Sequence, residues 1–111
     1  MVKHSSNQKP DYGYWLLPAG RVEKGENLEE ALKREMMKEL SISIEKVRKL
    51  IDHIDPYTGD KITNFLCTPL TSKVEISAEL EEVKWFNLKE VKKLRKIHPS
   101  LKQFLLTYLK F

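Results

Sequence analysis

Residues Gly20 to Ile42 read GRVEKGENLEEALKREMMKELSI, and the rest of the chain is interpreted outward from this stretch. Glycines and acidic residues open it, and a run rich in Glu, Lys, Leu and Met follows, which are good helix formers. Asn27 followed three residues later by Glu30 is a capping-box pattern, in which the Asn27 side chain accepts from a first-turn amide. The sequence therefore predicts a helix from Leu28 to Leu40.

Two carboxylates fall on the inward face of this predicted helix. At 100° per residue, Glu35 and Glu39 share one sector with the apolar residues of the first turns, which are Leu28, Ala31 and Leu32. Carboxylates on an inward face are costly unless a cation compensates them, so a metal ion is one explanation. The alternative is ordinary, partly solvated surface charge, which is the usual meaning of a charge run.

The length and composition of the chain predict one domain over residues 1–111. With 111 residues there is room for one modest core. No apolar run approaches the roughly 18 residues that span a bilayer, and MVKHSSNQKP lacks the apolar centre of a signal peptide, so we expect a cytoplasmic protein without membrane contact. Cys67 is the only cysteine, which excludes an intrachain disulfide and indicates a buried, inert thiol.

Positive charge gathers towards the end of the sequence. The chain carries a net charge of +4, whereas Lys84 to Phe111 alone has eight Lys or Arg and one acid. Such a region could attract nucleic acid, but no aromatic interleaving or recognition motif accompanies it, so a solvated lysine-rich surface is favoured.

The pattern of strands and helices predicts an α/β fold. Pro56 to Asp60 is a strong turn signal between two strand-like runs, and Asn87 with Glu90 repeats the capping pattern before a helix near Leu88. Leu101, Phe104, Leu105, Tyr108 and Leu109 form a buried stripe of a last helix. We expect four or five strands in a mixed sheet, at residues 12–17, 47–54, 61–68, 73–76 and 83–86.

The spacing within the opening stretch closely resembles the Nudix box, G-x5-E-x7-R-E-U-x-E-E-x-G-U, where U is aliphatic. Seven of the nine defined positions are met, by Gly20, Glu26, Arg34, Glu35, Met36, Glu39 and Ile42. The flanking stretches WLLPAG at 15–20 and EVKWF at 82–86 also look like those of the family. The resemblance implies a Nudix-like α/β/α sandwich with a mixed sheet. It also implies hydrolysis, assisted by Mg²⁺ or Mn²⁺, of a nucleoside diphosphate linked to another moiety, such as ADP-ribose or a (d)NTP.

The resemblance also assigns roles to residues. Glu39 would be the principal metal ligand, and Glu35 a second ligand or the base that activates water. Arg34 would orient Glu35 rather than touch the substrate. Glu26 would stabilise the loop or assist a metal. These assignments agree with the chemistry, because Mg²⁺ prefers oxygen ligands and keeps several waters.

Further candidates complete the predicted site. The backbone at Ala19 and Gly20 would offer a carbonyl ligand, and a later acid would add a ligand. Glu82 is the choice for that acid, with Glu79 and Glu81 as competitors and an exposed loop acid as the alternative. Tyr14 and Trp15 could stack a base, although core packing is the alternative for Trp15. His53, within a strand, is expected to be packed or hydrogen-bonded.

Two positions depart from the family pattern. Lys38 stands where the box has a glutamate, and Ser41 stands where it has a glycine. Lys38 could point outward and leave a weaker metal site, or it could pair with Glu35 or Glu39 and take a metal's place. In the second case the chain would be a non-catalytic Nudix-like domain that binds a nucleotide or a protein partner.

The start of the sequence departs as well, because Met1-Val2-Lys3 resembles only the tail of the strand with which family members normally begin. An unpaired sheet edge would then favour a homodimer.

Overall fold

The computed structural model describes residues 1–4, 13–56 and 58–110. Strands and helices alternate along this part of the chain in the order β1 (Val2–His4), α1 (Leu28–Leu40), β2 (Ile44–Ile54), β3 (Lys61–Pro69), β4 (Leu80–Val83), α2 (Leu88–Lys93) and α3 (Pro99–Phe104), followed by the π-helical turn η1 (Leu105–Leu109). The predicted α/β class is therefore confirmed. None of the helices in the described ranges is long and apolar enough to cross a membrane.

The described strands pair as two antiparallel ribbons, β2 with β3 and β1 with β4. Isolated bridges add the segment around Trp15 and Leu16, since Leu16 pairs with Val2 and Trp15 pairs in parallel with Ile97. A regular strand over residues 12–17 was expected, and Tyr12 lies outside the described residues. Pro18 lacks an N–H and limits the length of any strand there, so bridges replace a ladder.

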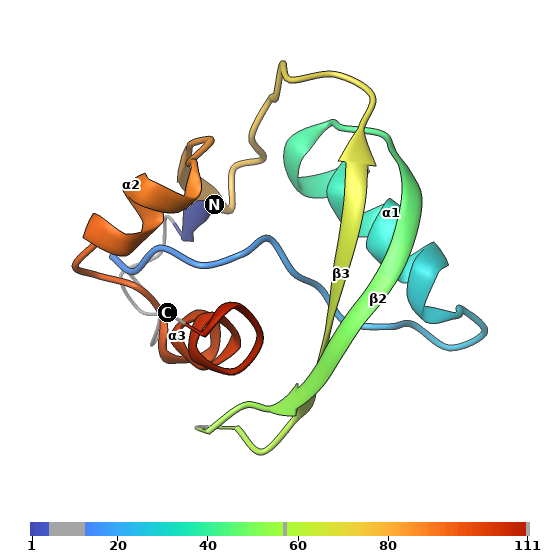
Figure 1. The fold of residues 1–111 in the computed structure, drawn as a ribbon. Helices are drawn as coiled ribbons and strands as arrows, with labels where there is room; N and C mark the ends of the chain where they lie inside the picture. Colours follow the sequence, from blue (N-terminus) through green and yellow to red (C-terminus); the bar gives the residue numbers. More distant parts are fainter. Residues whose placement is uncertain (5–12, 57, 111) are drawn as a thin grey trace.

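Two hydrophobic clusters hold helices on either side of this framework. Figure 1 shows α1 against the β2–β3 ribbon, whereas α2 and α3 gather with both chain ends in the other half of the molecule. Met36 and Leu40 of α1 pack with Ile44 of β2, together with Val2 and Leu80. Further along β2, Leu50 and Ile51 pack against the cluster formed by Val91, Leu101, Phe104 and Leu105. β2 therefore contacts both clusters and connects the α1 layer to the α3 layer.

The prediction of a strand at residues 73–76 is wrong. This segment instead runs past the end of α1, where the Glu75 amide donates to the Leu40 carbonyl and the Ser77 amide to the Glu39 carbonyl, both at 3.0 Å. The last carbonyls of a helix have no partner within the helix, so they take amides from the passing chain. Of the two apolar residues at 74 and 76, Val74 packs against the cluster that contains Met36 and Leu40, whereas Ile76 is 39% exposed.

The strand expected at residues 83–86 lies three residues earlier, as β4 (Leu80–Val83). Its partner β1 sets this position, because Val83 pairs with Val2 and Glu82 with Lys3. Trp85 lies beyond the ladder and is 55% exposed, and its indole N–H donates to the Ser72 carbonyl at 3.0 Å.

The predicted last helix is present, although one residue of its stripe is misplaced. Leu101, Phe104 and Leu105 are buried as expected, but Tyr108 is 40% exposed and stacks on Phe104 with 5.6 Å between ring centroids. The helix continues from Leu105 as a π-helical turn, whose wider winding rotates later residues away from the positions of an α-helix.

Helix α1 has the predicted bounds, and its two ends explain them. At the start, the Asn27 side chain accepts from the Glu30 amide at 2.8 Å. At the end, Ser41 adopts the left-handed conformation with φ 55°, and its amide donates to the Met37 carbonyl at 3.0 Å. Ser41 thus makes the C-terminal turn that the missing box glycine would make.

Replacing Ser41 with glycine is expected to stabilise the protein by about 0.5–1 kcal/mol. A side chain in the left-handed region costs roughly 1–2 kcal/mol, and the greater freedom of glycine in the unfolded chain cancels part of that gain. Urea unfolding of the parent and of Ser41→Gly would measure the difference. Ser43→Gly, at an exposed position without positive φ, is the control and should be neutral or destabilising.

Candidate active site

Arg34 is the centre of a hydrogen-bonded group that joins helix α1 to the loop before it. Its guanidinium donates from Nε to Glu26 Oε2 at 2.7 Å and from Nη2 to Glu26 Oε1 at 3.0 Å, a bidentate pair. Nη1 donates to Glu35 Oε1 at 2.6 Å, and Nη2 also donates to the Arg21 carbonyl at 2.9 Å. Arg34 therefore holds both Glu35 and the loop that carries Glu26.

These charge-assisted bonds change the ionisation of the group. The hydrogen bond from Arg34, followed by one from the Glu23 amide, holds the pKa of the Glu26 carboxyl below its usual range. Hydrogen bonds to Glu26 and then to Glu35 raise the pKa of Arg34. Glu23 also lies near the guanidinium, with 3.6 Å between its Oε1 and Nη1. The cation of Arg34 is thus surrounded by carboxylates.

Gly20 packs directly against the side chain of Glu35. A Cβ added at Gly20 would overlap Cγ and Cδ of Glu35 and would lie 2.6 Å from Oε2. Gly20 does not have a positive φ, so its glycine is required for close approach and not for backbone conformation. Arg34 and Gly20 together hold the Glu35 carboxylate from two sides.

Glu39 lies one helical turn after Glu35, and the two side chains are each 7% exposed. The expectation that both carboxylates share the inward face of the helix is therefore confirmed. Lys38, between them in sequence, is exposed. It lies in the last turn of α1, where a cation interacts favourably with the helix dipole.

A cleft of about 720 Å³ opens beside this group. Its walls come from the loop before α1, the first turns of α1, the β2–β3 ribbon and the start of α3, and they include Ala19, Gly20 and Glu35. Cys67 also lines the cleft, and burial raises the pKa of its thiol, which disfavours the thiolate. The cleft is large enough for a small molecule, since such sites span roughly 300–1,000 Å³.

The residues present fit a magnesium or manganese ion. Mg²⁺ is usually held by one or two carboxylates, with water and substrate phosphate completing its shell. Glu35 and Glu39 are two buried carboxylates one turn apart, and the backbone of Gly20 adjoins the first of them. Among the residues that the structure describes, no group of three or more His, Cys, Asp or Glu side chains is placed to hold a metal by itself.

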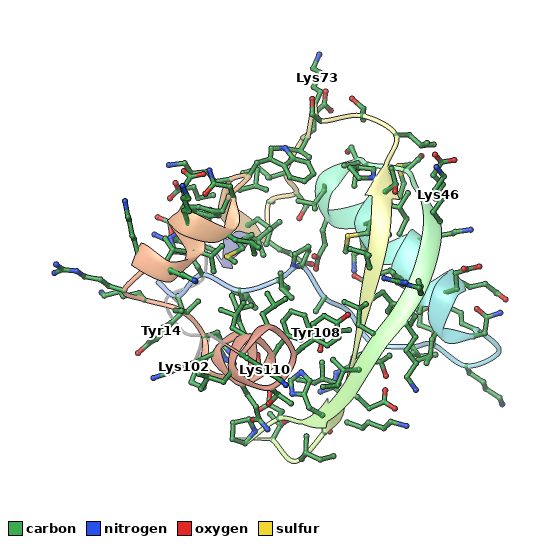
Figure 2. All side chains as sticks on the ribbon, viewed as in Figure 1. Tyr14, Lys46, Lys73, Lys102, Tyr108 and Lys110 are labelled. Carbon is green, nitrogen blue, oxygen red and sulfur yellow. The ribbon has the colours of Figure 1, made fainter. Side chains whose placement is uncertain are left out.

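Three predicted site residues are not brought to this group. Glu82 lies on β4, where its Oε1 is 3.8 Å from Lys3 Nζ, because its strand pairs with β1. Trp15 is 8% exposed and packs edge-on against Phe86, so it belongs to the core. Tyr14 is partly exposed, and Figure 2 shows it on the side of the molecule away from the β2–β3 ribbon. None of the three lines the cleft.

The structure also brings to the cleft two residues that were not predicted to belong to the site. His53 was expected to be packed or hydrogen-bonded, and it is buried, but neither ring nitrogen has a partner among the described residues. It lines the cleft together with Asn64 of the neighbouring strand. Their meeting depends on strand register, which no local pattern in the sequence reveals.

Known proteins resemble this chain in both sequence and fold. A Caenorhabditis elegans protein named as a nudix hydrolase is 37% identical over 82 residues, which is 72% of this chain and 22% of that protein. The NAD-capped RNA hydrolase NudC of Haemophilus influenzae (strain PittEE) is 26% identical over 88 residues, covering 78% of this chain and 33% of NudC. The chain therefore spans less than half of the length of these relatives.

Among solved structures, the MutT NUDIX hydrolase from Burkholderia pseudomallei superposes with a TM-score of 0.71 at 25% identity. The match covers 94% of this chain and 82% of that one. The family model for the NUDIX domain matches residues 1–108, which is nearly the whole sequence. With the box residues gathered around Arg34 and the fold of a Nudix hydrolase, the chain belongs to the Nudix family.

Proposed function

We propose that the chain hydrolyses a phosphoanhydride bond in a nucleoside diphosphate linked to another moiety, by attack of water with Mg²⁺ or Mn²⁺ bound. The observation that carries the proposal is the arrangement around Arg34, which holds Glu35 against Gly20 while Glu39 lies buried one turn further on. Carboxylates on adjacent turns of one helix can hold a divalent cation together with water and substrate phosphate, and a pyrophosphate needs such cations to be attacked.

Each residue has a proposed role in this reaction. Glu39 is the principal metal ligand, and Glu35 is the second ligand or the base that takes the proton of the attacking water. A divalent cation held there supplies neutralisation of the phosphate oxygens and a lower pKa of the water. Arg34 is a positioning residue that fixes the Glu35 carboxylate, while Glu26 secures the loop. The backbone at Ala19 and Gly20 is proposed to offer a carbonyl ligand.

The exposure of Lys38 supports catalysis over the alternative of a non-catalytic nucleotide- or partner-binding domain. Had its ammonium been buried between Glu35 and Glu39, it would have compensated their charge itself. On the exposed side of the helix it does not take the place of a metal ion. The missing glutamate then reduces the number of ligands without closing the site.

The test is a hydrolysis assay on a panel of substrates with Mg²⁺ or Mn²⁺. ADP-ribose, (d)NTPs, dinucleoside polyphosphates and sugar nucleotides represent the class. NAD-capped RNA joins them because the NudC relatives are NAD-capped RNA hydrolases. Product release that stops when EDTA removes the metal is the expected result. Release of no product from any member would contradict the proposal.

Lys38→Glu separates the two functions most sharply. If the chain is an enzyme, the variant is expected to hydrolyse the same substrate at half-maximal rate with about five- to tenfold less Mg²⁺, because an added carboxylate attracts the cation. If the chain only binds, hydrolysis would occur in Lys38→Glu and not in the parent. Lys33→Glu, an exposed charge reversal earlier on the same helix, is the matched control and should leave the metal dependence unchanged.

Two further expectations remain predictions. A cytoplasmic location follows only from the composition of the sequence. A homodimer could form through an edge of β2 or of β3. In the described part of the chain these two strands pair only with each other, so one edge of each strand has no partner strand. Light scattering on the purified chain would measure its mass in solution.

A further inference from the structure

Buried polar atoms without partners gather in the cleft. The described residues contain four buried side-chain N or O atoms that no other described group satisfies, and three of them belong to cleft residues: both ring nitrogens of His53 and the Oδ1 of Asn64. His53 is only 9% exposed. Such atoms are rare in native proteins because each costs the desolvation of a polar group, and they are normally satisfied by water or a ligand.

The β2–β3 register places these two side chains together. Asn64 is opposite Ile51, and His53 is opposite Ile62, so His53 and Asn64 are diagonal neighbours on one face of the ribbon. Diagonal neighbours lie about 7–8 Å apart, within reach of each other's long side chains, so one small ligand can contact both. The same cleft contains Gly20 and Glu35.

The rest of the cleft is largely apolar. Leu28, Leu32 and Met36 come from α1, and Ile62 and Phe65 come from β3. A site with apolar walls and a few convergent polar atoms binds a ligand that has apolar surface and a polar edge. Of these residues, Ile62 lies on the same face of β3 as Asn64, since the two are two residues apart in the strand.

The polar atoms restrict the chemistry of that ligand. Asn64 Oδ1 can only accept, so it requires a donor and disfavours a phosphate oxygen. A neutral imidazole offers one donor and one acceptor, so the pair together matches an edge with both N–H donors and acceptors. A nucleobase has such an edge on a flat, apolar body. Sugar hydroxyls share the donors and acceptors but lack the apolar faces that the walls would cover.

We propose that His53 and Asn64 recognise a nucleobase bound in the cleft by forming hydrogen bonds to its edge. This inference rests on the proposed function in that the bound molecule is the nucleotide whose phosphates lie at Glu35. It goes further in naming the residues that recognise the base and in assigning them a role in specificity and none in the bond cleavage.

The parent protein supplies the first test, which compares nucleotides with a base-free analogue. Calorimetric titration with AMP, GMP, CMP, UMP and ribose 5-phosphate is expected to show at least one nucleotide binding about tenfold or more tighter than ribose 5-phosphate. Equal affinity for all five would overturn the inference, since the base would then contribute nothing.

Two variants of similar volume supply the second test, Asn64→Leu and His53→Phe. Each is expected to remove most of the advantage of the preferred nucleotide over ribose 5-phosphate while leaving the affinity for ribose 5-phosphate within twofold. Their melting temperatures should be unchanged or raised, because unpaired buried polar atoms are replaced by apolar ones. Thr68→Val, at an exposed position of β3 outside the cleft, is the control.

The other outcomes each contradict the inference. An equal loss of affinity for nucleotides and ribose 5-phosphate would indicate contacts to sugar or phosphate. A large fall in melting temperature, or failure to fold, would show that the polar side chains serve the structure.

A hydrolysis assay distinguishes the two proposals. Cleavage of base-bearing and base-free diphosphates with equal kcat/KM would refute base recognition alone. Base-dependent binding without any cleavage would refute the hydrolase alone.

Discussion

Replacing Glu39 with glutamine is expected to lower kcat for phosphoanhydride hydrolysis by about 10³-fold, which corresponds to roughly 4 kcal/mol of transition-state stabilisation. Glutamine keeps the shape of the side chain but removes the charge that holds the cation.

A measurement independent of turnover accompanies this prediction. A ligand that binds only the folded protein raises its melting temperature, so Mg²⁺ or Mn²⁺ should stabilise the parent and have little effect on Glu39→Gln. Glu29→Gln is the matched control, because Glu29 is an exposed residue of the same helix that pairs with Lys33 at 3.7 Å. If Glu39→Gln retains more than about a tenth of the parental kcat, Glu39 is not the principal metal ligand.

Replacing Gly20 with alanine is expected to lower kcat by about 10²-fold, with only a small change in melting temperature. The new methyl group would take the place of the Glu35 side chain, which would have to move by about 1 Å or more, and displacements of this size cost about that factor. The backbone is not strained, because Gly20 lacks a positive φ. The displaced atoms belong to a flexible side chain, so the fold can accommodate the change.

Gly25→Ala is the matched control for Gly20→Ala and should show the opposite pattern. Gly25 has φ 88° and nothing within 4 Å of an added Cβ. Alanine there is expected to reduce stability by roughly 1–2 kcal/mol through backbone strain, while the activity of the folded protein stays near that of the parent. Both properties are measurable on the same samples by kinetics and urea unfolding. A Gly20→Ala enzyme with full activity would contradict the role given to the Gly20–Glu35 contact.

The sequence predicts those parts of the fold whose signals are local. Helix α1 has its predicted bounds because the residue that caps it, Asn27, is adjacent in sequence. The β2–β3 hairpin follows equally from the turn residues between Pro56 and Asp60, of which Tyr57 lies outside the described residues; Gly59 has φ 75° there, as a turn requires.

The errors arise where a distant partner decides the structure. Residues 73–76 alternate like a strand, yet the amides of Glu75 and of the following Ser77 donate to the last carbonyls of α1. The strand expected from Val83 ends there, because β1 at the other end of the chain pairs with Leu80 to Val83. No local pattern records which backbone groups will lie nearby after folding.

For the candidate site, the sequence by itself determined that Glu35 and Glu39 share one face of a helix, because helical periodicity alone places residues four apart together. It also supplied Arg34 and Gly20 at the spacing of the Nudix box. Only the tertiary structure decided that Arg34 joins Glu26 to Glu35 and that Gly20 meets the Glu35 side chain. It alone brought His53 and Asn64 into the same cleft. Those contacts join separate segments, and their positions are set by loop closure and strand register.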